Sequence, residues 1–274
     1  MYKLLITDLD DTLYSWTGFF IPAFYAMVEK VSSMTGISTE ILLDEYRSVH
    51  QEEGTIEYPF ATIQLPSVCD HYCGMTEGEI KEALRPAFNV FNVIRSEKLC
   101  LYPGVEETLR SLSEKGVRIV GFTDSGELNG FYRLQLLGID GFFSKVYVSN
   151  YEYRLPEHVV RDPRIRETEK RKPDPDLLLR IVKEEGLDRA DAICMGDSLT
   201  KDIYMAHKAG IASIHCRYQA GYDEAEYDRK LIRISSWTEE IFRREQELRL
   251  TCEREGIRPD YRIRDFREIG NIIG

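Results

Sequence analysis

The sequence predicts an α/β fold with a parallel sheet covered by helices on both faces, together with a small all-helical domain. Short apolar strands alternate with helical segments after residue 98, and such alternation is typical of βαβ units. Residues 15–98 instead show helical periodicity without a convincing strand. We therefore expect a discontinuous core of residues 1–14 and 99–274, with a helical domain over 15–98 inserted into it.

The first strand is the apolar run that begins at Leu4 and ends just before Asp8. The helical region follows, and its apolar residues recur at helical spacing, first at Phe20, Phe24, Met27, Val28 and Val31, then at Ile41, Leu42, Tyr46 and Val49. Thr76 and Glu79 have the spacing of a capping box. We expect a helix to start there and to run toward Phe88.

The core elements follow in a regular order, and glycines end several of the helices, as C-terminal caps commonly do. We expect a helix after Tyr102, then a strand at 118–122, a helix through 131–137, a strand at 146–148, a helix at 175–185, a strand at 192–195, a helix at 200–209 and a strand at 212–216. Segments 149–171 and 218–259 exceed what this scheme requires, and loops of such length tend to be functional or disordered. The second segment predicts a helix from Thr238 to Glu255, best explained as an amphipathic helix packed on the core.

The composition of the chain argues against nucleic-acid and membrane partners. The chain has 274 residues, 43% of them hydrophobic, and a net charge of −11. Acidity of this degree argues against a general nucleic-acid binder, which normally carries a basic surface. The longest apolar stretch, from Phe19 to Val28, contains a proline and falls short of the roughly 20 residues that span a bilayer. We expect a cytoplasmic protein without a membrane partner, and the oligomeric state stays open.

The six cysteines favour reduced thiols over a metal site. Cys69 and Cys73 flank His71, but no second pair of ligands at zinc spacing follows. We therefore interpret the cysteines as buried or inert thiols.

Polar side chains that can bind a metal ion or a phosphate follow the predicted strand ends. They are Asp8, Asp10 and Thr12 after the first strand, Thr123, Asp124 and Ser125 after the second, Lys172 before a proline-started helix, and Asp197 with Asp202 further on. In a parallel sheet these loops share one edge, where ligands bind. Acids as close as Asp8 and Asp10 repel each other unless a cation or substrate neutralises them, and Mg²⁺ prefers oxygen ligands. A carboxylate can attack phosphorus, and a lysine can stabilise charge on the oxygens that are transferred. This set of residues therefore predicts phosphoryl transfer.

The chain resembles the haloacid dehalogenase-like hydrolases in these motifs, namely Asp8-Leu9-Asp10-Asp11-Thr12-Leu13, Thr123, Lys172-Pro173-Asp174-Pro175, and Gly196-Asp197-Ser198 with Asp202. The tail at 261–263 and 266–273 also looks like that family's final strand and helix. The resemblance implies a Rossmann-like core in which the helical insert is a cap that closes over the site.

By motif, Asp8 would be the nucleophile and Asp10 the general acid/base. Thr123 and the Asp124 backbone would hold the phosphate, and Lys172 would screen its charge. Asp8, the Asp10 carbonyl and Asp197 would bind Mg²⁺, supported by Thr12 and Asp202.

An acid at Asp10 narrows the chemistry that the resemblance implies, because relatives that cleave carbon–halogen bonds lack an acid there. We expect a phosphatase acting on a small phosphorylated metabolite. Asp11 with Tyr14 resembles the branch that contains nucleotide 5′-monophosphatases, so a nucleoside monophosphate and a sugar phosphate both stay open. A phosphomutase on the same fold and a non-catalytic binding protein are the alternatives.

Two details of the resemblance stay open. The gap between Ser149 and Lys172 is long, so Lys170 or Arg171 could replace Lys172 in principle, although Pro173 favours Lys172. Several residues of the helical insert are possible substrate contacts, but each is more readily a surface residue and none is assigned: Arg47, His50, His71, Arg85 and Arg95.

Overall fold

The computed structural model describes residues 1–150 and 161–274, and its contacts divide the chain into two compact units. The core unit comprises Met1–Ser15, Cys100–Gln219 and Glu245–Gly274. The helical unit comprises Trp16–Leu99 and Ala220–Arg244. From the sequence we expected all of 99–274 to belong to the core, whereas the contacts group 220–244 with the inserted helices.

The core unit is built on a parallel sheet, so the predicted α/β fold class is confirmed. Within the described residues its seven strands follow the order β4-β3-β2-β1-β5-β6-β7. Their bounds are β1 Leu4–Thr7, β2 Arg118–Gly126, β3 Lys145–Ser149, β4 Ile165–Thr168, β5 Ala192–Gly196, β6 Ala212–Cys216 and β7 Tyr261–Ile263. Strand β1 lies at the centre between β2 and β5. The chain therefore delivers its first acidic motif to the middle of the carboxyl edge.

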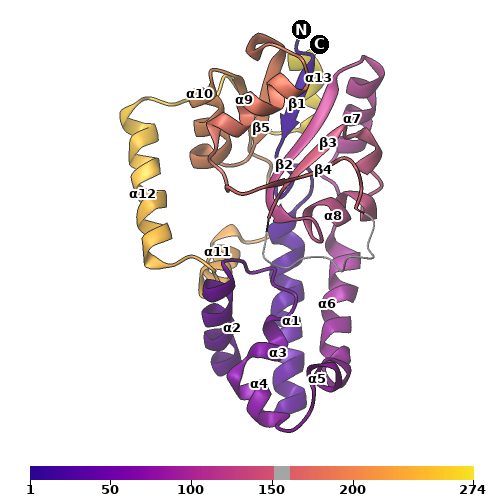
Figure 1. Cartoon of the computed structure of the whole chain (residues 1–274), viewed down its shortest axis with the longest axis vertical. Coiled ribbons are helices and arrows are strands. Elements are labelled where there is room, and N and C mark those ends of the chain that lie inside the picture. Colours follow the sequence, from indigo (N-terminus) through magenta and orange to yellow (C-terminus); the bar gives the residue numbers. More distant parts are fainter. Residues whose placement is uncertain (151–160) are drawn as a thin grey trace. The chain divides into compact units, whose positions relative to one another are not determined.

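Helices cover both faces of this sheet, as Figure 1 shows for α7 on one side and α9 with α10 on the other. The helices of the core unit are α7 Val105–Glu114, α8 Gly130–Leu136, α9 Pro175–Glu184, α10 Tyr204–Ala209 and α13 Ile269–Ile273. Helix α12, Glu239–Arg254, begins in the helical unit and ends in the core unit. Apolar side chains of α9 and α10 pack with alternate residues of β1, such as Leu4 and Ile6. Strands of a parallel sheet are buried on both faces, and this burial fixes the register of β1 and the position of its last residues.

The helical unit contains the helices expected from the periodicity. Their bounds are α1 Trp16–Thr35, α2 Thr39–Glu53, α3 Ala61–Gln64, α4 Pro66–His71, α5 Glu77–Ala83 and α6 Arg85–Lys98. The capping box at Thr76 is present, with reciprocal hydrogen bonds to Glu79. The expected continuation to Phe88 is wrong, because the chain starts a new helix at Arg85 with a proline in its first turn, where proline is tolerated.

The segment 220–244 completes the core of this helical unit. It forms α11, Glu224–Arg233, and then brings the Ile234 carbonyl within 2.8 Å of His50 Nδ1. Gln51 donates to the Trp237 carbonyl at 3.0 Å, and Tyr25 donates to the Lys230 carbonyl at 2.9 Å. The expectation that His50 is a surface residue is therefore wrong, because its side chain is fully buried.

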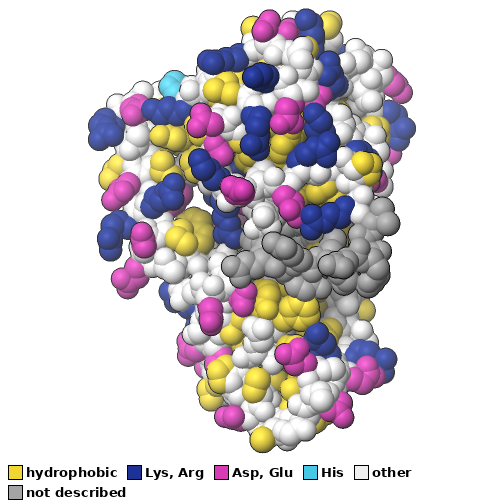
Figure 2. Space-filling view, viewed as in Figure 1, with side chains coloured by type: hydrophobic (Ala, Val, Ile, Leu, Met, Phe, Trp, Pro, Cys, Tyr) yellow, Lys and Arg dark blue, Asp and Glu magenta, His cyan; other side chains and the backbone are white. Residues whose placement is uncertain are grey.

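The surface carries charges of both signs. On the face drawn in Figure 2, Lys and Arg side chains are interspersed with Asp and Glu rather than gathered in one area. No helix in the described part of the chain is both long enough and apolar enough to cross a membrane.

Candidate active site

Asp8 follows β1 directly and lies at the centre of the site. Its backbone N–H donates to the Met195 carbonyl at 2.8 Å, so the pairing of β1 with β5 continues through this residue. Its Oδ1 accepts from Lys172 Nζ at 2.5 Å, and its Oδ2 accepts from the Thr12 hydroxyl at 3.1 Å. The carboxylate is thus oriented by groups from two separate segments.

Lys172 is the basic residue that the fold brings to this carboxylate. Its ammonium group also lies 2.8 Å from Asp202 Oδ1, and its side chain is 2% exposed. Burial alone would lower the pKa of Lys172, but the Asp202 and Asp8 carboxylates outweigh burial and raise that pKa above its ordinary value. Lys172 therefore remains charged, and the geometry places Lys172 rather than Lys170 or Arg171 beside Asp8.

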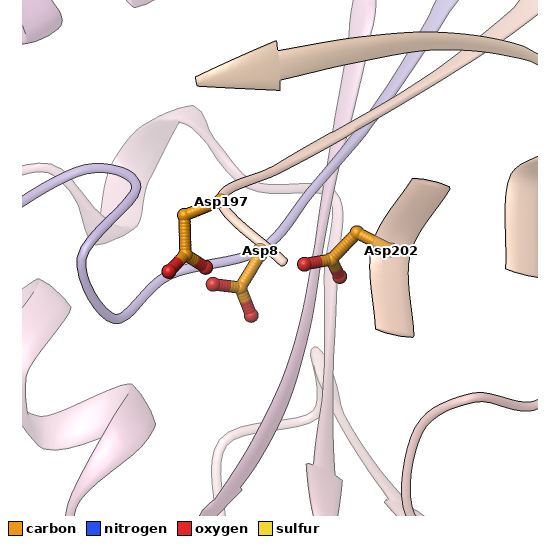
Figure 3. Close-up of side chains that lie close together, drawn as sticks. All are labelled: Asp8, Asp197 and Asp202. Carbon is orange, nitrogen blue, oxygen red and sulfur yellow. The ribbon is translucent and has the colours of Figure 1, made fainter. Parts of the chain in front are cut away.

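Three carboxylates face one another at the carboxyl edge of β1 and β5. Oxygens of Asp8, Asp197 and Asp202 lie within 4.8 Å of one another, and Figure 3 shows Asp8 between the other two. Burial raises the pKa of Asp8, with Asp202 and Asp197 adding to the rise and Lys172 opposing it. Desolvation, then Asp202 and Asp11, likewise raises the pKa of Asp197, although solvent screens part of this effect because the Asp197 side chain is exposed.

This cluster has the chemistry of a site for a hard divalent cation. The carboxylates repel one another, and one lysine does not cancel their charge, so a cation would relieve the repulsion that raises the pKa of Asp8. Oxygen donors at this separation suit Mg²⁺, which is held by a few carboxylates and keeps several waters. The residues present therefore fit the metal.

Asp202 approaches the centre closely because position 196 has no side chain. A Cβ atom built on Gly196 would lie 2.2 Å from both Cγ and Oδ2 of Asp202. Asp202 Oδ2 accepts from the Ser198 N–H at 3.2 Å, while Oδ1 accepts from Lys172. Both of its oxygens are thus engaged, which suits a supporting group better than a metal ligand.

Asp10 belongs to a different set of contacts from Asp8. Its Oδ1 accepts from the Tyr14 hydroxyl at 2.8 Å, and its Oδ2 accepts from the Ser125 hydroxyl at 2.7 Å and more weakly from Thr123 at 3.3 Å. The Arg133 guanidinium lies 3.3 Å from Oδ1. Two acids one residue apart therefore have separate partners.

Asp124 braces the loop that carries Lys172. Its Oδ1 accepts from the Lys172 N–H at 2.8 Å, and its Oδ2 pairs with Lys201 Nζ at 2.9 Å. Burial would raise the pKa of Asp124, but Lys201 and Lys172 hold it below its ordinary value. The Asp124 side chain is therefore an ionised partner of two basic residues.

The structure brings all of the predicted site residues to one edge of the core unit: Asp8, Asp10, Thr12, Thr123, Asp124, Lys172, Asp197 and Asp202. Sequence reasoning missed Arg133 and Lys201. Each is a basic residue within a helical segment, and such residues usually lie on the surface. The only sequence signal that either residue belongs to the site is its position shortly after the end of a strand.

Comparisons with known proteins agree with this geometry. A curated relative from Methanopyrus kandleri, named glyceraldehyde 3-phosphate phosphatase, is 26% identical over 221 residues, which cover 79% of this chain and 84% of the relative. A Haemophilus influenzae protein named phosphoglycolate phosphatase is 30% identical over 54% of this chain and 59% of its own length. The crystal structure of a 2-haloacid dehalogenase from Pseudomonas syringae superposes with a TM-score of 0.59 at 20% identity, covering 100% of this chain and 98% of that one.

The first of these relatives spans most of the chain, and the crystal structure shows the same fold. The family model for haloacid dehalogenase-like hydrolases matches residues 2–210. That range contains both Asp8 and Asp202, the first and last residues of the site described above. The chain belongs to the haloacid dehalogenase-like hydrolase family.

Proposed function

We propose that this protein is a Mg²⁺-dependent phosphatase that hydrolyses a small phosphorylated metabolite through an aspartyl-phosphate at Asp8. The observation that carries the proposal is the position of Asp8, held between the buried Lys172 ammonium group and the Asp197 and Asp202 carboxylates. A nucleophile beside a fixed cation can attack a phosphate whose negative charge would otherwise repel it.

The reaction proceeds in two steps, formation and hydrolysis of the aspartyl-phosphate. A carboxylate oxygen of Asp8 attacks phosphorus as the bond to the ester oxygen breaks, and the leaving oxygen takes a proton from the Asp10 carboxyl group. The Asp10 carboxylate then takes a proton from water as the water oxygen attacks phosphorus and the bond between phosphorus and the Asp8 oxygen breaks. Inorganic phosphate leaves, Asp8 is restored, and Asp10 again carries a proton.

Other residues of the site bind and orient the phosphate. Lys172, already paired with Asp8, stabilises charge on the phosphoryl oxygens. The Thr123 hydroxyl and the Asp124 backbone lie at the end of β2 and hold the phosphate beside Asp8. Asp8, Asp197 and the Asp10 carbonyl would hold Mg²⁺, which when bound neutralises phosphate charge.

The names of the relatives suggest which substrates to try first. The Methanopyrus kandleri and Haemophilus influenzae relatives are named for glyceraldehyde 3-phosphate and phosphoglycolate, both small phosphate monoesters. Together with the nucleoside monophosphates and sugar phosphates suggested by the sequence, these compounds define a short panel.

The test measures release of inorganic phosphate from this panel with Mg²⁺ and with EDTA. The wild-type protein should release phosphate from at least one ester, and EDTA should abolish the release. Asp8→Asn should abolish it as well, whereas Glu106→Gln, which changes an exposed ion pair with Arg110, should not. An isomeric product without inorganic phosphate would point to a mutase instead. Absence of metal-dependent phosphate release from the whole panel would refute the proposal.

A further inference from the structure

We propose that Arg133 is a positioning residue that aims the Asp10 carboxyl group at the leaving oxygen of the substrate. The inference rests on the proposed function, because it concerns how Asp10 donates its proton. Arg133 belongs to α8 and lies outside the four sequence motifs of the site, eight residues after Ser125. Its side chain is 4% exposed, so its charge is largely removed from solvent.

Arg133 belongs to a set of contacts around Asp10. Its Nη2 donates to the Ser125 hydroxyl at 2.9 Å and lies 3.3 Å from Asp10 Oδ1. The same Ser125 hydroxyl donates to Asp10 Oδ2 at 2.7 Å. Arg133 thus contacts one carboxylate oxygen directly and orients the hydroxyl that binds the other. Rotation of the carboxylate would break contacts at both oxygens.

Tyr14 also contacts Asp10. Its hydroxyl donates to Asp10 Oδ1 at 2.8 Å, and the Arg133 guanidinium lies 5.8 Å from the centre of the Tyr14 ring. The Tyr14 side chain is fully buried, so its hydroxyl is fixed by packing. The carboxylate of Asp10 is therefore held by groups from the first motif, the end of β2 and α8.

The backbone of α8 comes near enough for this contact because Gly130 begins the helix. A Cβ atom at Gly130 would lie 2.9 Å from Thr123 Cγ2 and 3.4 Å from Ser125 Cβ. Real Cβ atoms essentially never come within 3.0 Å of another atom. Arg133 lies three residues later, on the same face of the helix as Gly130. Helix α8 therefore packs against the site at the point from which Arg133 reaches Asp10.

This arrangement separates the tasks of two neighbouring acids. Asp8 is oriented by Lys172 and Thr12, whereas Asp10 is oriented by Arg133, Ser125 and Tyr14. A proton donor must keep hydrogen-bonding geometry toward the leaving oxygen while phosphorus moves toward Asp8. Loss of Arg133 should therefore weaken protonation of the leaving group more than attack by Asp8.

The experiment compares two leaving groups of different basicity. An alkyl phosphate expels a strongly basic alkoxide that needs a proton, whereas 2,4-dinitrophenyl phosphate expels a stable anion that does not. The measured quantity is kcat/KM, which reports the steps up to the first irreversible one, here loss of the leaving group, and excludes hydrolysis of the aspartyl-phosphate. The alkyl substrate is the one that wild type hydrolyses best in the phosphate-release panel.

We expect Arg133→Met to lower kcat/KM for the alkyl phosphate about 10- to 100-fold and for 2,4-dinitrophenyl phosphate by less than about 3-fold. Arg133→Lys, which keeps the charge, should recover part of the loss. Ser125→Ala should show the same selectivity without leaving a buried charge, so the test stands even if Arg133→Met does not fold. Arg118 lies at the start of β2 and forms an ion pair with Glu185. Arg118→Met should leave kcat/KM unchanged for both substrates.

The outcomes separate this inference from the proposed function. If the wild type hydrolyses neither phosphate, the proposed function fails and the role of Arg133 fails with it. If the wild type is active but Arg133→Met and Ser125→Ala lower kcat/KM equally for the two substrates, or lower it for neither, Asp10 does not depend on Arg133 and the inference alone is overturned.

Discussion

Acidification should destabilise the helical unit through His50. The imidazole is fully buried, and its Nδ1 lies 2.8 Å from the Ile234 carbonyl, which can only accept a hydrogen bond. Nδ1 therefore carries the proton of the neutral ring, while Nε2 is buried without a hydrogen-bond partner among the described residues. Phe24 and Tyr46 lie against the ring. Protonation would place a charge among these aromatic side chains.

The magnitude follows from the shift in the pKa. Burial lowers the pKa of His50 from 6.5 to about 4, although the Ile234 carbonyl opposes the shift. The unfolded chain thus binds the proton at a higher pH than the folded one does. The stability contributed by neutral His50 is complete above pH 6.5 and falls as the pH decreases toward 4. The full loss is about 3 kcal/mol, and about 2 kcal/mol of it falls between pH 7 and pH 5.

The assay is urea unfolding followed by tryptophan fluorescence. Trp16 and Trp237 both belong to the helical unit, so the signal reports the unit that contains His50. The unfolding free energy of His50→Asn, whose amide can replace the Nδ1–H donor, should decrease less between pH 7 and pH 5 than that of wild type, by about 2 kcal/mol. His71→Asn, at an exposed histidine, should behave as wild type. Identical pH dependence of wild type and His50→Asn would refute the reasoning.

Three further predictions concern the core unit. Gly196→Ala should lower the free energy of unfolding by about 1–3 kcal/mol because its Cβ meets Asp202, whereas Gly270→Ala, with nothing within 4 Å, should not; urea denaturation distinguishes them. Lys172→Met should lower the same free energy by about 3–5 kcal/mol, since it leaves the part-buried Asp8 and the buried Asp202 carboxylates without their cation, and a loss below about 1 kcal/mol would contradict this pairing. Mg²⁺ should raise the thermal midpoint of wild type but not that of Asp197→Asn, whose metal-free midpoint should be higher than that of wild type; equal Mg²⁺ shifts in the two proteins would exclude Asp197 as a ligand.

Much of the site geometry could be predicted because each polar group follows a strand whose apolar run is plain in the sequence. The carboxyl ends of parallel strands share one edge, so placing β1 and β5 also places Asp8 and Asp197. The helix that follows Lys172 starts with a proline, which also fixed the position of the loop that carries Lys172. The order of the strands along the chain and their common direction were therefore enough to place these residues.

The elements that were missed are short or strongly charged. Strand β4 is four residues long and carries the exposed pair Arg166 and Glu167. Helix α11 has no fully buried residue, and six of its ten residues are charged; Tyr227 and Leu231, four residues apart, pack against the core of the helical unit. The expected extra loop before Lys172 lies partly at 151–160, outside the described residues. Short or charged elements of this kind are held by partners distant in the sequence, and pattern reasoning does not identify those partners.

The direction of buried charged side chains could not be predicted either, and at this site it determines the chemistry. Asp8 and Asp10 are one residue apart and chemically identical in the sequence, yet one faces Lys172 and the other faces Arg133. Both basic residues come from segments more than a hundred positions away along the chain. A buried carboxylate is stable when a partner compensates its lost hydration. The fold therefore distinguishes the two acids by giving each its own set of partners, and under the proposed mechanism Asp8 is the nucleophile and Asp10 the proton donor.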